Sequence, residues 1–175
     1  MKEKITVFAA IVPSVLILDF FTKSWALDAL SGGKGMEILG GFVPLRLAYN
    51  KGAAFGISLG SDSRWFFIPI TILALTLLLV LLRQAGQRDW LRMCSISMVV
   101  AGALGNLYDR VRWDLGVVDF IGPINLGFMD WPIFNVADMS ITCGAVLLAI
   151  SFWAEERRER AAPEVVEEGE PTATG

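Results

Sequence analysis

Four long, almost uninterrupted apolar stretches constrain this chain more than any other feature of its sequence. They cover residues 5–27, 65–82, 91–108 and 133–153, and a stretch of about 17 to 25 residues is long enough to cross a bilayer as a helix. Backbone groups need internal partners in lipid, so apolar runs without alternation predict helices rather than barrel strands. The hydrophobic share of 54% agrees. We therefore predict an all-α membrane protein with four transmembrane helices.

Two long segments separate these spans. In the first, residues 36–39 and 42–49 flank Gly40 and Gly41, and residues 45–49 alternate in polarity. That pattern predicts a β-hairpin on the membrane surface. We interpret the second segment, residues 111–131, as a surface loop. Residues 1–160 then form a single integral-membrane domain, and the acidic residues 161–175, rich in Pro, Glu, Gly and Thr, form a disordered tail.

Basic residues near the span ends predict the orientation, because Lys and Arg are enriched in short cytoplasmic segments. Those on one side of the predicted bundle are Lys2, Lys4, Arg83, Arg88, Arg92, Arg157, Arg158 and Arg160. We expect both termini and this side to be cytoplasmic. The hairpin and the second long loop would then be periplasmic or extracellular.

Polar residues inside the spans gather near the outer ends when depth is counted at about 1.5 Å per residue. They are Asp19, Asn106, Asp109, Asn135 and Asp138. Asp119 lies nearby in the apolar segment VVDFI. An ionisable group at membrane depth costs on the order of 2.5 to 3.5 kcal/mol, so these carboxylates call for a functional explanation.

The hypothesis that these residues support is an aspartic protease pair, Asp119 and Asp138, at the outer membrane surface. Two adjacent carboxylates share one proton, so that one activates water while the other polarises a carbonyl. The pair titrates as a unit, and the sequence leaves open which member holds the proton.

Several other chemistries are excluded or left open. The chain has no histidine, which excludes Ser-His-Asp, Cys-His and HExxH sites. No metal or cofactor is expected, and no basic face for nucleic acid is apparent. A Ser-Lys peptidase using Lys23 remains an alternative. So do a proton-coupled transporter and a non-enzymatic scaffold whose polar residues join helices.

Some of these residues also have purely structural interpretations. Asp19 and Lys23 are four residues apart and can form an ion pair on one helix face. Asp109 is expected to pair with its neighbour Arg110. Asp138 is less suited to capping its helix, because we expect that helix to begin near Pro132.

Five motifs in chain order resemble one known family. They are Asp19-Phe20-Phe21-Thr22-Lys23, Asn50-Lys51-Gly52-Ala53-Ala54-Phe55-Gly56, Gly105-Asn106-Leu107-Tyr108-Asp109-Arg110, Val118-Asp119-Phe120 and Phe134-Asn135-Val136-Ala137-Asp138. The chain is similar, from Ile5 to about Trp153, to the lipoprotein signal peptidases, or signal peptidase II. This resemblance implies an aspartic endopeptidase of the bacterial inner membrane that cuts prolipoproteins just before a diacylglyceryl-modified cysteine.

The resemblance also implies roles for single residues and for partners. It places the catalytic pair at Asp119 and Asp138. Residues that bind substrate or support the site are then Asp19, Lys23, Asn50, Gly52, Ala53, Phe55, Asn106, Asp109, Arg110 and Asn135, with Asn50 and Arg110 expected to hold the substrate. The implied partners are a lipid-modified prolipoprotein, membrane lipid and globomycin-like inhibitors. We expect the protein to be a monomer.

Overall fold

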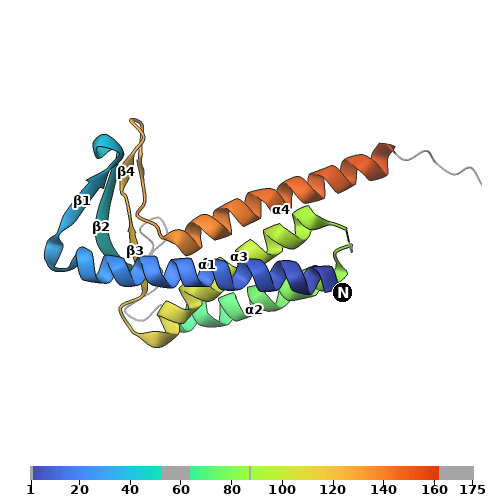
Figure 1. Ribbon diagram of the computed structural model, residues 1–175, viewed down its shortest axis with the longest axis horizontal. Helices are drawn as coiled ribbons and strands as arrows, with labels where there is room; N and C mark the ends of the chain where they lie inside the picture. The colour runs from blue at the N-terminus through green and yellow to red at the C-terminus, as the bar shows by residue number, and fades with distance from the viewer. Residues whose placement is uncertain (1, 53–63, 87, 162–175) are drawn as a thin grey trace, which may run out of the picture.

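Four long helices make up most of the molecule (Figure 1). The computed structural model describes residues 2–52, 64–86 and 88–161. The helices are α1 (Lys2–Ala29), α2 (Arg64–Gln84), α3 (Trp90–Arg112) and α4 (Val136–Ala161). Each is long and apolar enough to cross a membrane, which confirms the prediction of four helices that are candidate membrane spans. The predicted tail from residue 162 onward lies outside the described residues.

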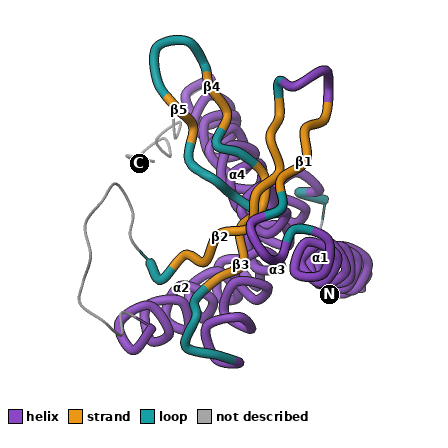
Figure 2. Tube along the Cα trace, turned by 90° about the vertical axis from the view of Figure 1, so that its left-hand side faces the viewer, coloured by secondary structure: helices purple, strands orange, loops and turns teal. Residues whose placement is uncertain are grey.

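Helix α3 is the central element of the bundle. It packs against α1, α2 and α4 (Figure 2). In its most apolar 18-residue segment 56% of the residues are buried, far more than in the corresponding segment of α1, α2 or α4. Glycines allow α4 to come close: a Cβ at Gly102 would overlap the backbone oxygen of Ala137, and one at Gly144 would lie 2.8 Å from the Ser95 oxygen. Close backbone approach of this kind is how small residues hold membrane helices together.

Gly102→Ala should therefore destabilise the protein, because the two helices must separate to admit the methyl group. We expect a loss of about 1 to 3 kcal/mol, measured as a lower Tm in detergent. Gly86→Ala is the matched control, since its nearest neighbour outside the adjacent residues would be 3.8 Å away. Equal Tm values for the two variants would contradict the close packing of α3 on α4.

A three-stranded antiparallel sheet lies at one end of the bundle. Strands β1 (Gly35–Ile38) and β2 (Val43–Asn50) form the predicted hairpin, with Ile38 opposite Val43. Strand β3 (Val117–Ile121) pairs with the other edge of β2 and places Asp119 opposite Ala48. A second hairpin joins β4 (Ile124–Asn125) and β5 (Asp130–Trp131).

The interpretation of residues 111–131 as a surface loop was therefore incomplete, because three strands lie in it. An isolated hairpin is marginally stable, and a third strand with an apolar face stabilises it. In β3 that role belongs to VVDFI, in which every residue except Ile121 is buried.

Apolar contacts fix the sheet to the end of α1. Ala26 and Leu30 from α1 and its end pack with Val43, Leu45 and Phe120 from the sheet. A separate apolar cluster at the other end of the bundle joins α1, α2 and α3. The N-terminus lies at that other end (Figure 1). The sheet is thus held over the ends of the helices, and Asp119 with it.

Helix α4 begins at Val136, not near residue 133 with Pro132 at its first turn. Phe134 is extended and bridges Ile121: its N–H donates to the Ile121 oxygen at 3.0 Å, and the Ile121 N–H donates back at 2.9 Å. These sheet-like hydrogen bonds hold the chain extended up to Phe134. The later start brings Asp138 into the first turn of the helix.

Candidate active site

Asp119 is presented by the sheet. Asp119 is buried, with only 2% of its surface exposed, although its side chain is a carboxyl group. The Asn135 side-chain nitrogen donates to Asp119 Oδ1 at 2.7 Å, and the Asn50 side chain also hydrogen-bonds it. Asn50 ends strand β2, directly beside β3. Strand pairing thus places Asp119 and one of its partners together.

Asp138 is held by a capping box at the start of α4. Its N–H donates to Asn135 Oδ1 at 2.8 Å, and its Oδ2 accepts from the Asn135 N–H at 3.2 Å. This reciprocal arrangement satisfies two backbone donors that a helix start leaves unpaired. The prediction that Asp138 lies too late to cap the helix was therefore wrong, because α4 begins later than expected. The positive end of the helix dipole also favours an anion here.

Asn135 joins the two aspartates. Its side-chain amide reaches Asp119 while its backbone holds Asp138, and it is fully buried. The Asn106 Nδ2 donates to Asp138 Oδ1 at 2.7 Å, and Asn106 Oδ1 accepts from the Asn135 amide at 3.1 Å. The two carboxylates that the sequence paired as candidates are thus linked through one residue.

The carboxylates of Asp119 and Asp138 also interact electrostatically. Burial, together with the neighbouring Asp138, raises the pKa of Asp119 to about 7, although hydrogen bonds from Asn50 and Asn135 act in the opposite direction. Desolvation disfavours the charged form of any carboxyl group, and a second carboxylate nearby adds to the effect. Near neutral pH, Asp119 can therefore carry the proton of the pair.

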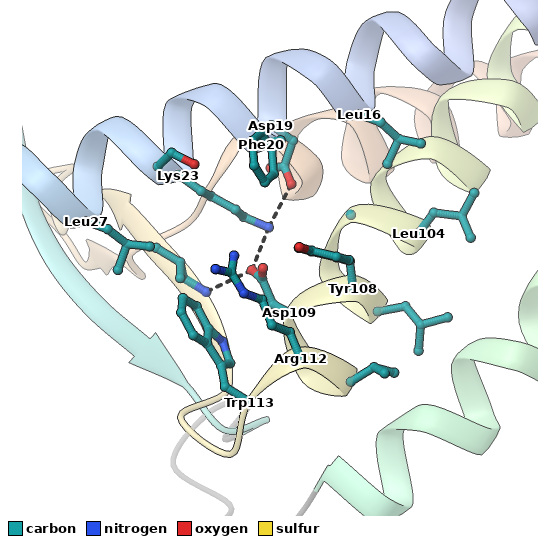
Figure 3. Close-up of a pocket in the computed structure, with 15 residues that line it drawn as sticks. Leu16, Asp19, Phe20, Lys23, Leu27, Leu104, Tyr108, Asp109, Arg112 and Trp113 are labelled. Carbon is teal, nitrogen blue, oxygen red and sulfur yellow. Dashed lines mark hydrogen bonds and ion pairs between the residues drawn. The ribbon is translucent and has the colours of Figure 1, made fainter.

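Lys23 occupies the centre of a buried ionic cluster beside the aspartates (Figure 3). Its ammonium lies 2.8 Å from Asp19 Oδ2, 2.9 Å from Asp109 Oδ2 and 3.0 Å from Asn106 Oδ1. An ammonium has three N–H donors, and all three are used. The predicted Asp19–Lys23 ion pair is confirmed. The predicted Asp109–Arg110 pair was wrong, because among the described residues the ion pair of Asp109 is with Lys23.

The cluster also fixes the elements that carry the two aspartates. Asp19 Oδ1 accepts from the Ala137 N–H at 2.9 Å, at the start of α4. Asp109 Oδ2 accepts from the Val118 N–H at 3.2 Å, next to Asp119 on β3. Through these bonds α1 and α3 set the positions of α4 and β3. A Lys23 held in this way is poorly suited to act as the base of a Ser-Lys peptidase, which requires a free amine.

Arg110 brings a positive charge to the same place. Its guanidinium interacts electrostatically with Asp138, Asp119 and Asp109, and its Nη1 donates to the Asn106 backbone oxygen at 3.3 Å. It also stacks over the Phe67 ring at 5.2 Å. The guanidinium thus adds a positive charge to the electrostatic surroundings of the two carboxylates.

Gly52 and Phe67 form the wall next to Arg110. Gly52 has a positive φ of 95°, its N–H donates to Asn50 Oδ1 at 2.8 Å, and a Cβ would overlap the Phe67 ring. Only glycine combines that φ with that close approach. Sequence reasoning missed Phe67, because the stretch of α2 from residue 65 to 82 carries no charge and its pattern singles out no residue. Ala53 and Phe55, predicted from the same motif as Gly52, lie outside the described residues.

Apolar grooves reach this region on two sides. One of about 500 Å³ reaches Asp138 and is lined by Met129, Trp131, Phe134 and Met139. Another of about 520 Å³ lies between α1 and α3 and reaches Asp19, Lys23 and Asp109 (Figure 3). Within the described residues, no group of three or more potential ligands could hold a metal ion. The arrangement offers a pair of carboxylates beside an apolar surface, which suits hydrolysis of a bond in an apolar substrate.

Comparisons with known proteins give a consistent result. Residues 11–154 match the family model described as signal peptidase (SPase) II. The lipoprotein signal peptidase of Hydrogenovibrio crunogenus is 39% identical over 85% of this chain and 86% of its own length. That of Streptococcus pyogenes is 33% identical over 89% and 97%. Two solved bacterial membrane enzymes share the fold: one has a TM-score of 0.79 at 34% identity over 91% of this chain and 94% of its own, the other 0.75 at 36% over 85% and 93%.

Proposed function

The chain belongs to the signal peptidase II family and is a peptidase that removes signal peptides from prolipoproteins, and we propose that Asp119 and Asp138 hydrolyse the peptide bond. The observation that carries this proposal is the attachment of both carboxylates to Asn135. Membership of a peptidase family replaces the transporter and scaffold hypotheses.

In the proposed reaction Asp138 is ionised and Asp119 is protonated. Asp138 takes a proton from water, whose oxygen adds to the carbonyl carbon, while Asp119 gives its proton to the carbonyl oxygen. When the tetrahedral intermediate collapses, the C–N bond breaks, the proton held by Asp138 passes to the leaving amine, and Asp119 takes its proton back from a hydroxyl of the intermediate as the carbonyl re-forms. The raised pKa of Asp119 and the N–H donors around Asp138 support this division of roles.

The substrate is proposed to lie between the sheet and the start of α4. Arg110 and Asn50 would hold its backbone near the two aspartates, and the apolar groove at Asp138 would accept apolar side chains or an acyl chain. The residue after the cut bond would be the diacylglyceryl-modified cysteine. Asp19, Lys23, Asn106, Asp109 and Asn135 would position the carboxylates, and Gly52 would shape the wall.

The same proposal places the protein in the bacterial inner membrane with its active site near the outer leaflet. Both termini would be cytoplasmic and the sheet periplasmic or extracellular. The basic residues at the end of the bundle away from the sheet support this orientation. We further propose that the protein acts as a monomer in contact with membrane lipid, and that globomycin-like inhibitors occupy the substrate site.

The pH dependence of cleavage tests the division of roles. We expect kcat/KM for a lipid-modified prolipoprotein, measured from about pH 5 to about pH 9, to fall as the pH rises through the Asp119 pKa of about 7. The fall reflects loss of the proton that Asp119 holds. A profile that stays level across this range would contradict the assignment of the proton to Asp119.

Stability gives an independent readout of the same pKa. The folded-state pKa of Asp119, about 7, lies above the usual value of 3.8, so the folded protein binds more protons between these values. The stability contributed by protonated Asp119 is thus fully present below the lower pKa and lost as pH rises through the higher one. Relative to Asp119→Asn, the wild type should therefore become less stable over this interval, measured as the difference in Tm.

A further inference from the structure

A third groove is lined by residues at the start of α1 and the end of α2. This end of the bundle, where the N-terminus is found, lies opposite the sheet (Figure 1). Helices α1 and α2 both pack on α3 but share few contacts with each other. The groove between them has a volume of about 740 Å³, and its apolar lining consists of Ile5, Phe8, Ala9, Leu79 and Leu82. Neither aspartate of the proposed catalytic pair lines it.

Two cationic side chains stand at the rim of this groove. Lys4 and Arg83 line it from opposite helices, and the Lys4 ammonium donates to the Arg83 backbone oxygen at 2.6 Å. This bond satisfies a carbonyl at the end of α2 that has no partner within the helix. Among the described residues the Lys4 ammonium has no other hydrogen-bond acceptor, so two of its three donors are unused there. In the part of the chain that the structure describes, no carboxylate forms an ion pair with Lys4 or with Arg83.

The surroundings keep the rim positive. Lys2 adds a third positive charge, and Glu3, the acidic residue in the first turn of α1, offsets only one of the three. The N-terminus of α1 also carries the positive end of its helix dipole. An anion is therefore favoured at the rim.

The groove walls indicate what accompanies that anion. Ile5 is 62% exposed and Leu79 is 43% exposed, on helices long and apolar enough to cross a membrane. Lipid is the natural cover for such a surface, and basic pockets between membrane helices bind anionic lipid headgroups. The volume is also within the usual range of ligand sites, about 300 to 1,000 Å³.

We propose that this groove binds one anionic phospholipid, whose phosphate contacts Lys4 and Arg83 while an acyl chain lies against Ile5, Phe8 and Leu79. The lipid fills the gap that α1 and α2 leave on α3 and so links the two helices. A zwitterionic lipid brings its own cation to the rim and is bound more weakly. The proposal is independent of the peptidase assignment, since the groove lies at the other end of the bundle.

The test is a titration of the purified protein in detergent with phosphatidylglycerol or phosphatidylcholine of identical acyl chains, read by native mass spectrometry. The wild type should bind one phosphatidylglycerol in preference to phosphatidylcholine. Lys4→Gln combined with Arg83→Gln should weaken phosphatidylglycerol binding by roughly thirtyfold, at the usual contribution of a basic residue near anionic lipid. Arg157→Gln combined with Arg160→Gln removes the same charge from α4, outside the groove, and should leave binding unchanged.

A second variant examines the apolar wall without changing any charge. Ala9→Phe fills the groove and should weaken binding of both lipids. Equal binding of the two lipids by the wild type, or equal losses in the Lys4/Arg83 and Arg157/Arg160 variants, would overturn the proposal. So would a protein dimer that Ala9→Phe disrupts without any dependence on phosphatidylglycerol, because a second copy would then occupy the groove. If the Lys4/Arg83 variant does not fold, two results still test the proposal: the preference of the wild type for phosphatidylglycerol, and the weaker lipid binding expected of Ala9→Phe.

Discussion

Asp119→Asn and Asp138→Asn should each abolish cleavage of a diacylglyceryl-modified prolipoprotein by the purified protein. Asparagine keeps the shape of the side chain but cannot take up or release the proton that the reaction moves. General acid-base catalysis contributes about 10²- to 10⁴-fold in rate. Each aspartate moves a proton in both steps of the proposed reaction, so we expect a loss of turnover at or above the upper end of this range. The measurement is turnover in detergent with identical enzyme concentrations.

Asp114→Asn is the matched control for these variants. Asp114 is exposed and lies in the turn before β3, outside the candidate site, so its replacement should leave turnover unchanged. Each variant must also keep a cooperative unfolding transition. Turnover close to that of the wild type in a folded Asp119→Asn or Asp138→Asn variant would make that aspartate structural and remove it from the proposed mechanism.

Lys23→Met should be the most destabilising single change in the buried ionic cluster. It removes the cation shared by Asp19 and Asp109, both less than 5% exposed, and leaves two carboxylates facing each other without compensation. Breaking a buried ion pair from one side costs about 3 to 5 kcal/mol. Activity should fall as well, because the cluster holds Ala137 and Val118 next to the two aspartates. Chemical unfolding in detergent and the cleavage assay measure the two effects.

An exposed ion pair of the same spacing provides the control. Arg160 and Glu156 are also four residues apart on one helix, but both side chains are mostly in solvent. Exposed pairs contribute about 0 to 1 kcal/mol, so Arg160→Met should have little effect. Adding Asp19→Asn and Asp109→Asn to Lys23→Met should restore part of the lost stability, since the orphaned charges are then gone. A Lys23→Met variant as stable as Arg160→Met would contradict the stabilising role assigned to Lys23 in the buried ionic cluster.

Helix α4 shows where sequence reasoning reached its limit. The length and position of its apolar run were visible, but its first residue was not. Pro132 is a common first-turn residue, yet the hydrogen bonds between Phe134 and Ile121 keep the chain extended beyond it. The role of Asp138 in capping depends on that boundary. The contact between Phe134 and Ile121 joins residues 13 positions apart and leaves no periodic signal in the sequence of either segment.

The sequence by itself determined the four spans, the first hairpin and the candidate aspartates. Span length and turn chemistry are local properties, and a carboxylate in an apolar segment is conspicuous wherever it folds. Only the tertiary structure decided that β3 joins β2, that Lys23 rather than Arg110 pairs with Asp109, and that Asn135 links Asp119 to Asp138. These choices depend on which segments lie side by side in space. The energy that selects them comes from burying charges and donors together, and it exists only once the helices and the sheet have assembled.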